Sequence, residues 1–354
     1  MTRLNFTRFD MKRMRRKLFN AAPLAGALAS PVVSPLVSLL LSPLVSSLVS
    51  SLAIAQSFPT KPIRIIVPAV PGSAVDVNAR RIAPKLGELL GQPILVENRA
   101  GANSAIGARE VARAAPDGYT IFQGNVNNSL NDLLTSDTSA RLNAELIPIT
   151  RLFGSPLMML VHPSVPANNL REYIELAKAK PQTVTFASGG TGAITQLLGE
   201  RVKAAAGINI REIPYKSIGA ELPDLTAGHV MTAFLVPGVV TQFIKGGKLR
   251  ALAVAGPRRV SILPEVPTMA EAGLPGVEAA GWNGLFAPAG TPSAIINRLQ
   301  QAVTQTLNQP DIRDEAATFG SEIGGDRPEE FGAYVRNEIA RWGKVIKDAG
   351  IKLE

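Results

Sequence analysis

The sequence predicts an α/β fold with mainly parallel sheets. From Pro62 onward, short apolar segments of strand length alternate with longer segments that have the apolar spacing of helices. Hydrophobic residues make up 46 % of the 354-residue chain and charged residues 18 %, which is typical of a folded protein rather than a disordered one. Strands that alternate with helices in this way usually run parallel, because each helix returns the chain to the edge where the next strand begins.

Short apolar runs bounded by turn residues mark the strands. The helix expected after the first strand has Ala79, Ile82 and Leu86 on one face, and Pro84 within it predicts a kink or a late start. A second helix is expected over 169–180, and a long C-terminal helix carries an apolar face that includes Phe331, Tyr334, Val335, Ile339, Trp342, Val345 and Ile346. The strands are expected at residues 63–68, 94–98, 119–124, 184–188, 210–215 and 249–254.

The N-terminus has the pattern of an export signal. A basic cluster, "KRMRRK" (12–17), precedes an apolar, acid-free stretch that ends in "AIAQ", with Ala53 and Ala55 in small-x-small spacing. We therefore expect residues 1–55 to be a signal peptide that is cleaved after about Ala55 to give an exported, periplasmic protein. An uncleaved anchor is the alternative, although Pro31, Pro35 and Pro43 disfavour a regular membrane helix. The sequence leaves open whether the Sec or the twin-arginine route is used.

The charge and the reactive side chains exclude several classes of function. Net charge is +9, but residues 1–55 account for +6, so the remainder has too little excess charge to favour nucleic acid as a partner. There is no cysteine, and His162 and His229 lie far apart, so neither a transition-metal site nor a metal cofactor is expected. No HExxH, Walker A or GxSxG motif is present, and the sequence therefore predicts no enzyme.

Three polar loops follow predicted strands. "PGSAVD" (71–76) and "SGGTGAIT" (188–195) each place glycines and hydroxyl residues between a strand end and a helix start, where backbone N–H groups are free to bind an anion. "GNVNNSLN" (124–131) adds neutral amides after a third strand. Neutral donors with few nearby cations suit a small carboxylate better than a triphosphate. Ordinary capped helices in βα turns are the alternative interpretation.

The chain resembles the substrate-binding proteins of tripartite tricarboxylate transporters, the Bug family, from about Phe58 to its C-terminus. The resemblance is carried by "PTKPIRIIVPAVPGSAVDVNARRIA", "LGQPILVENRAGANSAIGAREVARAAPDGYT", "LPEVPTMAEAGLPG", "WNGLFAPAGTP" and "FGAYVRNEIARWGKVIKDAGIKLE". It implies a type II-like periplasmic binding protein of two lobes, 56–156 with 280–354 and 157–279, each a sheet flanked by helices. It also implies a monomer that captures a small organic carboxylate and delivers it to integral membrane permease subunits. A ligand-binding sensor that feeds a membrane signalling receptor is the alternative function.

The resemblance also implies where the ligand binds and how this chain differs. The family holds its carboxylate largely through backbone amides of the turn over 70–76 and of the glycine-rich loop over 188–195. Where the family commonly has Phe-Asp-Asn, this chain has Phe234-Leu235-Val236, which favours an apolar or aromatic acid over a ligand with an ammonium group. Trp282 either stacks on the ligand or belongs to the core, and Lys216 is either a cleft cation or a surface residue. The predicted ligand-binding residues are Val70, Gly72, Ser73, Asp76, Asn125, Asn127, Asn128, Ser188, Gly190, Thr191, Gly192, Thr195, Tyr215 and Leu235.

Overall fold

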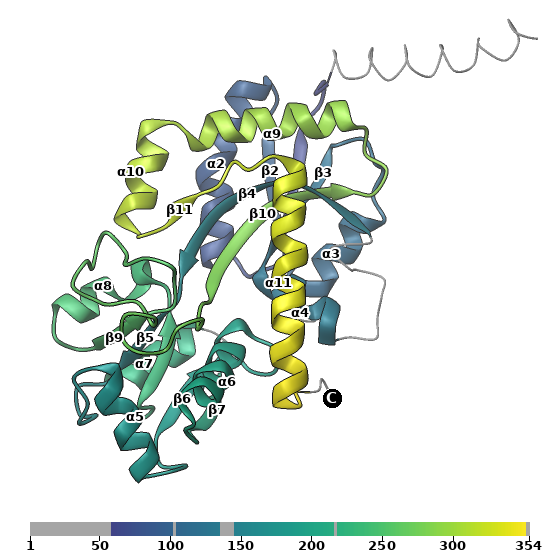
Figure 1. Ribbon diagram of the computed structural model, residues 1–354. Helices are drawn as coiled ribbons and strands as arrows, with labels where there is room; N and C mark the ends of the chain where they lie inside the picture. Colours follow the sequence, from purple (N-terminus) through teal and green to yellow (C-terminus); the bar gives the residue numbers. More distant parts are fainter. Residues whose placement is uncertain (1–57, 102–103, 135–144, 216–217, 352–354) are drawn as a thin grey trace, which may run out of the picture. The chain divides into compact units, whose positions relative to one another are not determined.

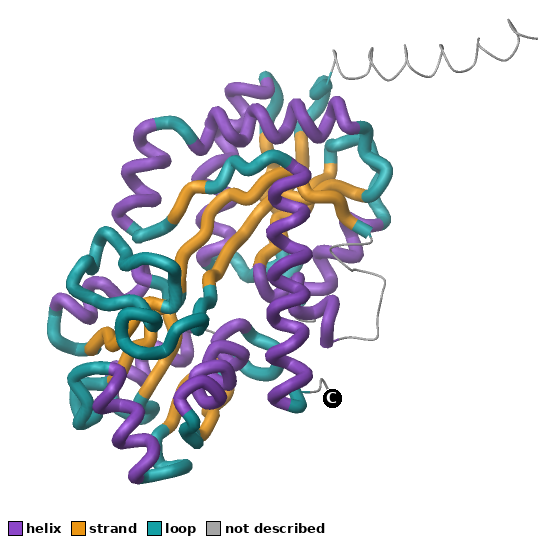
Figure 2. The backbone as a smooth tube through the Cα atoms, in the orientation of Figure 1, coloured by secondary structure: helices purple, strands orange, loops and turns teal. Residues whose placement is uncertain are grey.

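Two mixed β-sheets with helices packed on them form the part of the chain described by the computed structural model (Figure 1), which covers residues 58–101, 104–134, 145–215 and 218–351. The predicted signal peptide and Lys216 lie outside the described residues. Figure 2 shows the strands of both sheets in orange with the purple helices beside them. Within the described ranges, no helix combines the length and the apolar content needed to cross a bilayer.

The first sheet has six strands in the order β11-β4-β10-β3-β1-β2. Strand β1, next to the edge strand β2, pairs in parallel with β2 and β3, whereas β10 is antiparallel to β3 and β4, and β11 is antiparallel to β4. The carboxyl ends of β1 and β3 therefore lie at the same edge, and both loops that follow them begin there. The strands are β1 (Ile63–Val67), β2 (Ile94–Asn98), β3 (Thr120–Asn125), β4 (Leu146–Pro156), β10 (Ala280–Pro288) and β11 (Glu322–Ile323).

The second sheet has five strands in the order β7-β6-β8-β5-β9. Its strand β6 is parallel to β7 and β8, whereas β5 is antiparallel to β8 and β9. The glycine-rich segment thus leaves the sheet from β6, between two parallel neighbours. The strands are β5 (Met158–Val161), β6 (Thr185–Ser188), β7 (Arg211–Pro214), β8 (Thr232–Leu235) and β9 (Arg250–Val254).

The predicted α/β class is confirmed, and each of the six expected strands is present with its ends within one residue of the prediction. The sheets are, however, mixed rather than mainly parallel. The chain passes from one sheet to the other through β4 and β5, with only Leu157 between them, and returns through β10. β10 in the first sheet and β5 in the second run opposite to β1, β3 and β6, and they therefore pair antiparallel with the strands on either side, whereas β4 runs in the same direction as β1 and β3.

Helices cover both faces of the first sheet because β1 is apolar on both sides. Ile63, Ile65 and Val67 pack with residues of α2 and α9, while Ile66 joins a second core cluster that includes residues of α3, α4 and α11. α2 starts at Ala74, so the late start considered for Pro84 does not occur. The helices on this sheet are α2 (Ala74–Leu90), α3 (Ala105–Ala112), α4 (Val126–Leu134), α9 (Ser293–Leu307), α10 (Pro310–Thr318) and α11 (Pro328–Ala349).

The predicted apolar face of the C-terminal helix is confirmed. In α11, Phe331, Val335 and Trp342 are buried, and Tyr334 and Ile339 pack against the same core. α11 contacts α4 and β4 as well as α6, so it packs against helices that follow strands of both sheets. The helices of the second sheet are α5 (Leu170–Ala179), α6 (Ile194–Ala206), α7 (Ile218–Ala227) and α8 (Pro237–Lys245).

Candidate functional site

The turn after β1 is shaped by one glycine and one N-cap serine. Gly72 has φ +80°, and no heavy atom lies within 4 Å of where a Cβ would stand, so the backbone conformation alone requires glycine here. Ser73 is extended, and its hydroxyl accepts a hydrogen bond from the Asp76 N–H at 3.3 Å. This is the capping arrangement that starts α2 directly after the turn.

Asp76 holds this turn in place through both oxygens of its carboxylate. The carboxylate, only 2 % exposed, accepts hydrogen bonds from the Gly72 N–H (2.9 Å), Arg80 Nε (3.0 Å) and Asn98 Nδ2 (2.9 Å). Burial alone would raise the pKa of Asp76, but the hydrogen bonds from Arg80, Gly72 and Asn98 outweigh it and hold the pKa below its usual value. Asp76 is therefore ionised and committed to the turn itself.

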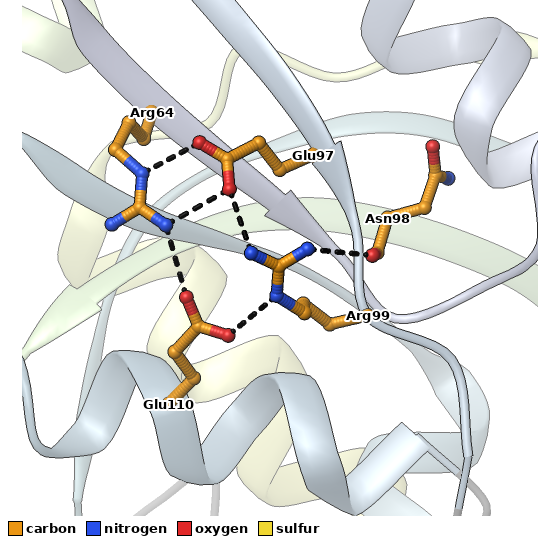
Figure 3. A network of polar contacts seen from close by, with 5 residues as sticks. All are labelled: Arg64, Glu97, Asn98, Arg99 and Glu110. Carbon is orange, nitrogen blue, oxygen red and sulfur yellow. Dashed lines mark hydrogen bonds and ion pairs between the residues drawn. The ribbon is translucent and has the colours of Figure 1, made fainter.

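A ring of four charged residues joins β1, β2 and α3 beside the turn that follows β1 (Figure 3). Arg64 on β1 binds Glu97 on β2 (2.7 Å) and Glu110 on α3 (3.0 Å), and Arg99 binds the same two carboxylates (3.0 and 2.9 Å). Arg99 also donates to the carbonyl oxygen of Asn98 at 3.1 Å. The hydrogen bond from Arg64 is the main cause of the lowered pKa of Glu97. The ring fixes β1, β2 and α3 to one another beside the turn.

The asparagine-rich segment after β3 is the start of a helix, not the polar loop that its composition suggests. β3 ends at Asn125, and α4 begins at Val126. The Asn125 side-chain oxygen accepts from the N–H groups of Asn127 (2.9 Å) and Asn128 (3.4 Å), and the Asn128 oxygen accepts from the Asn125 N–H (3.0 Å). These side chains replace the backbone acceptors that are missing at a helix start.

The glycine-rich loop between β6 and α6 uses its own glycine N–H groups internally. Gly190 and Gly192 both have positive φ, +85° and +79°, which glycine adopts without strain. The N–H groups of three glycines are bound by side chains of the same segment: Gly189 by Thr195 Oγ1 (2.8 Å), Gly190 by Ser188 Oγ (3.1 Å) and Gly192 by Gln196 Oε1 (2.8 Å).

Glu212 on β7 connects the two ends of this loop. Its carboxylate accepts a hydrogen bond from the Ser188 hydroxyl and another from Gln196 Nε2 at 3.0 Å. Neither Gln196 nor Glu212 was predicted as a site residue. The signal that could have found Glu212 is its position on the strand that pairs with β6, opposite Phe186.

The first turns of the two helices leave N–H groups without acceptors. Among the described residues, none accepts a hydrogen bond from the N–H groups of Ala74 and Val75 in α2, or from those of Thr195 and Gln196 in α6. Such groups carry the positive end of the helix dipole and favour an anion. The hydrogen bonds inside both loops hold the backbone so that these donors stay fixed in direction.

Polar contacts connect two of the three predicted loops directly. The Asn127 side-chain oxygen accepts from the N–H of Ile194, the first residue of α6, at 3.4 Å. On the first sheet, Gln123 Nε2 donates to the Val75 carbonyl oxygen (3.0 Å) and to Asn283 Oδ1 (3.3 Å). Gln123 is fully buried, and its Oε1 has no partner among the described residues. Sequence reasoning missed Gln123 because its partners come from a helix and a strand distant in the chain.

The remaining predicted residues have different surroundings. Tyr215 lies beside the glycine-rich loop, because its N–H donates to the Ser188 carbonyl oxygen (2.8 Å) and its hydroxyl to Asp224 (2.8 Å). Val70 is 62 % exposed on the first turn. Leu235 is fully buried in β8 opposite Met158, so its side chain belongs to the core of the second sheet.

The core interpretation of Trp282 is confirmed. Its side chain is 2 % exposed, and its ring packs edge-on against Phe331 (5.6 Å) and Tyr334 (6.0 Å). The two histidines have local partners, Ser164 for His162 and Asp224 for His229. Across the described ranges, no group of three His, Cys, Asp or Glu side chains is arranged to hold a metal ion.

Comparison with known proteins identifies the family. Residues 78–351 match the profile of the tripartite tricarboxylate transporter family receptor. The chain belongs to this family. It is 34 % identical to protein BugT of Bordetella pertussis over 85 % of this chain and 93 % of BugT. Members of the family are solute-binding receptors rather than enzymes, and so is this protein.

Two solved structures are similar over nearly their whole length. Rpa4515 of R. palustris, determined with adipate, is 32 % identical with a TM-score of 0.76 over 83 % of this chain and 99 % of its own. MatC of Rhodopseudomonas palustris, determined with bound malate, is 30 % identical with a TM-score of 0.72 over 82 % of this chain and 100 % of its own. The α/β fold is thus shared with two proteins whose structures contain adipate and malate.

Proposed function

We propose that this receptor binds a small organic carboxylate and presents it to the membrane permease of a tripartite tricarboxylate transporter. The observation that carries the proposal is the pair of helix starts, α2 and α6, each with two first-turn N–H groups that have no acceptor among the described residues, while the loops before them are internally hydrogen-bonded. Rpa4515 and MatC, the two similar receptors, hold adipate and malate. Both ligands are dicarboxylates, and one carboxylate at each helix start would use both sets of donors.

The proposed site consists of three segments. The turn over 70–76 provides the N-terminus of α2, the segment over 188–195 provides that of α6, and Asn125, Asn127 and Asn128 belong to the segment after β3, from which Asn127 contacts the start of α6. In this assignment Asp76, Ser188 and Thr195 position the backbone through their side-chain hydrogen bonds. Tyr215 supports the second loop through the hydrogen bond from its N–H to Ser188, and Leu235 packs in the core of the same sheet.

Binding is proposed to close two lobes, 56–156 with 280–354 and 157–279. The two connections between the sheets are hydrogen-bonded to each other: Leu157 N–H donates to Ala279 O (2.9 Å), and Ala255 N–H donates to Leu157 O (2.7 Å). A ligand that contacts segments of both sheets stabilises the closed arrangement through these additional contacts. The permease would recognise that form.

The proposed location is the periplasm, reached by cleavage of the 1–55 leader after Ala55, and the proposed working form is a monomer. Because Leu235 stands where a carboxylate is common in the family, the preferred ligand is expected to be an acid without an ammonium group. The protein is expected to need no cofactor and no nucleic acid for this role.

The test is a thermal-shift and calorimetric screen of the exported protein, purified from the periplasm of an expressing host. Adipate, malate, benzoate and aspartate are compared with dimethyl adipate, which has the same chain but no carboxylate. An acid at a hundred times its dissociation constant should stabilise the fold by about 2.7 kcal/mol, and the ester should give no shift. Binding of the ester as tight as that of the acid, or no response to any acid, would refute the proposal.

A further inference from the structure

Glu221 in α7 carries a buried carboxyl group whose Oε1 has no hydrogen-bond partner among the described residues. The residue is 1 % exposed, and its Oε1 is completely buried with no partner. No hydrogen bond or ion pair from a described residue to this oxygen is present. A buried polar group in this condition costs free energy in the unliganded protein, and it therefore needs an explanation.

Glu221 lies in the first turn of α7, at the edge of the second sheet where the glycine-rich loop leaves β6. α7 follows the parallel strand β7 and packs against β6 and β8, so its first turn stands at the carboxyl ends of these strands. The entry to α7 is attached to the loop, because Tyr215 donates its N–H to Ser188 and a Cβ on Gly190 would stand 4.0 Å from the Tyr215 carbonyl oxygen.

The groups around Glu221 do not neutralise its charge. β6 and β8, which α7 covers, contain no ionisable residue. The Tyr215 hydroxyl is bound to Asp224, which also pairs with His229 at 3.2 Å, and Glu212 is bound to Ser188 and Gln196. With no described cation beside it, burial raises the pKa of Glu221 to about 7.

On the basis of the proposed function, we propose that Glu221 is a ligand-binding residue whose protonated carboxyl group donates a hydrogen bond to a carboxylate oxygen of the solute. Ionised Glu221 would instead place a negative charge beside the ligand anion. Binding of the acid is then coupled to proton uptake by Glu221, and affinity falls as the pH rises. The backbone N–H groups of the loops supply the other hydrogen-bond donors. Glu221 adds one further donor, and binding therefore favours a solute that has an acceptor oxygen at this position.

The experiment is calorimetric titration of the exported protein with malate from about pH 6 to about pH 8.5, in two buffers of different ionisation enthalpy. If only the protonated form binds, the dissociation constant of the wild type rises about 30-fold over this range, and proton uptake appears as a difference between the buffers. Glu221→Gln keeps a neutral donor of the same shape, and its affinity should not vary with pH. Asp224→Asn removes another acid of the same helix and should keep the wild-type slope.

Each outcome decides the proposal. A wild-type affinity that is constant over the range, with no proton uptake, would overturn it, and this measurement does not depend on the folding of any variant. A Glu221→Gln protein with the wild-type slope would assign the titration to another group and would also overturn it. Absence of binding by every acid at every pH would refute the proposed function instead, so the two failures are distinguishable.

Discussion

The turn after β1 and the glycine-rich loop after β6 both hold the backbone in place before the start of a helix, but they do so with different side chains. In both, a glycine with positive φ shapes the backbone and glycine N–H groups are bound internally, while two N–H groups of the following helix start have no acceptor in the part of the chain that the structure describes. The first turn is held by the ionised Asp76, its partner Arg80 and the ring of charges behind them. The second is held by hydroxyl and amide groups together with the single carboxylate of Glu212.

This difference shows that, in such a site, the groups expected to contact the ligand are separate from the side chains that hold the backbone in place. Asp76 is acidic and lies in the turn where an anion is expected to bind. Its carboxylate, however, already accepts hydrogen bonds from Arg80, Asn98 and Gly72. Near the second loop, the buried acid Glu221 of α7 has no such partner at its Oε1 among the described residues. The two acids should therefore respond to pH in opposite directions, and this gives the sharpest way to test the comparison.

The largest expected effect is the pH dependence of stability due to Glu221. Its pKa is raised in the folded protein to about 7, so its contribution to stability is full below the unfolded value of 4.5 and is lost as the pH rises through 7. The full loss is about 3 kcal/mol at 1.36 kcal/mol for each pH unit between the two pKa values, and about 2 kcal/mol of it falls between pH 5.5 and 8.5. Urea unfolding of the unliganded protein at pH 5.5 and 8.5 measures it, and Glu221→Gln should abolish most of the difference. Equal stability of the wild type at both values would contradict the assignment.

Asp76→Ala should destabilise the protein by about 2–3 kcal/mol, because it leaves Asn98, Gly72 and Arg80 without their buried acceptor. The lowered pKa of Asp76 means that its contribution is present above the unfolded value of 3.8 and is lost as the pH falls through the lower folded pKa. Urea unfolding measures both effects.

The matched control for Asp76 is Asp348→Ala, which breaks an exposed pair of the same i,i+4 spacing with Lys344. Its effect should stay within about 0.5 kcal/mol. Similar losses for Asp76→Ala and Asp348→Ala would show that the first turn does not depend on its buried carboxylate.

Glu212→Ala tests the second loop and should cost about 1–2 kcal/mol of stability, since Ser188 and Gln196 lose a shared acceptor. Ligand affinity should fall about tenfold or more, because the first-turn donors of α6 are no longer held in direction. The control Glu200→Ala breaks an ion pair with Lys203 elsewhere on α6 and should leave affinity unchanged. If both variants bind equally well, the role given to Glu212 is wrong.

Gly72→Ala and Gly190→Ala should each cost about 1 kcal/mol, because both positions have positive φ and space for a methyl group. Gly91, at the other end of α2, has φ +70° and equally open surroundings, so Gly91→Ala should cost the same stability. Only the first two variants should weaken ligand binding in calorimetric titrations. A loss of affinity in Gly91→Ala as large as in Gly72→Ala would mean that global stability, and not the turn, is responsible.

The sequence allows the elements to be predicted well because local patterns determine them. Apolar runs bounded by turn residues locate β1, β2 and β6, and the spacing from Phe331 to Ile346 defines the buried face of α11. Strand direction was less predictable, because it depends on where the chain crosses between the sheets at Leu157 and through β10. The mixed sheets follow from that path and not from any local pattern.

For the candidate site, the positions of the turns could be predicted but not their internal bonding. Glycine and serine before a helix indicate the turns at Gly72 and Gly190, whereas asparagines after β3 suggest a loop although they cap α4. Gln123 and Glu212 acquire their roles only through strand pairing and helix packing. No local pattern reveals that Glu221 is buried with an Oε1 that has no partner within the described ranges.

The most direct test is the amide NMR spectrum of the isotope-labelled, exported protein during titration with malate or adipate. Carboxylates bound at the two helix starts should give their largest N–H shifts at Ala74, Val75, Thr195 and Gln196, the donors that lack acceptors among the described residues. Those of Gly72 and Gly192, already bound within their loops, should move less. A different result, with the largest shifts around the cavity of about 940 Å³ that Arg151, Arg258 and Tyr334 help to line, would place the carboxylate elsewhere and contradict the assigned site.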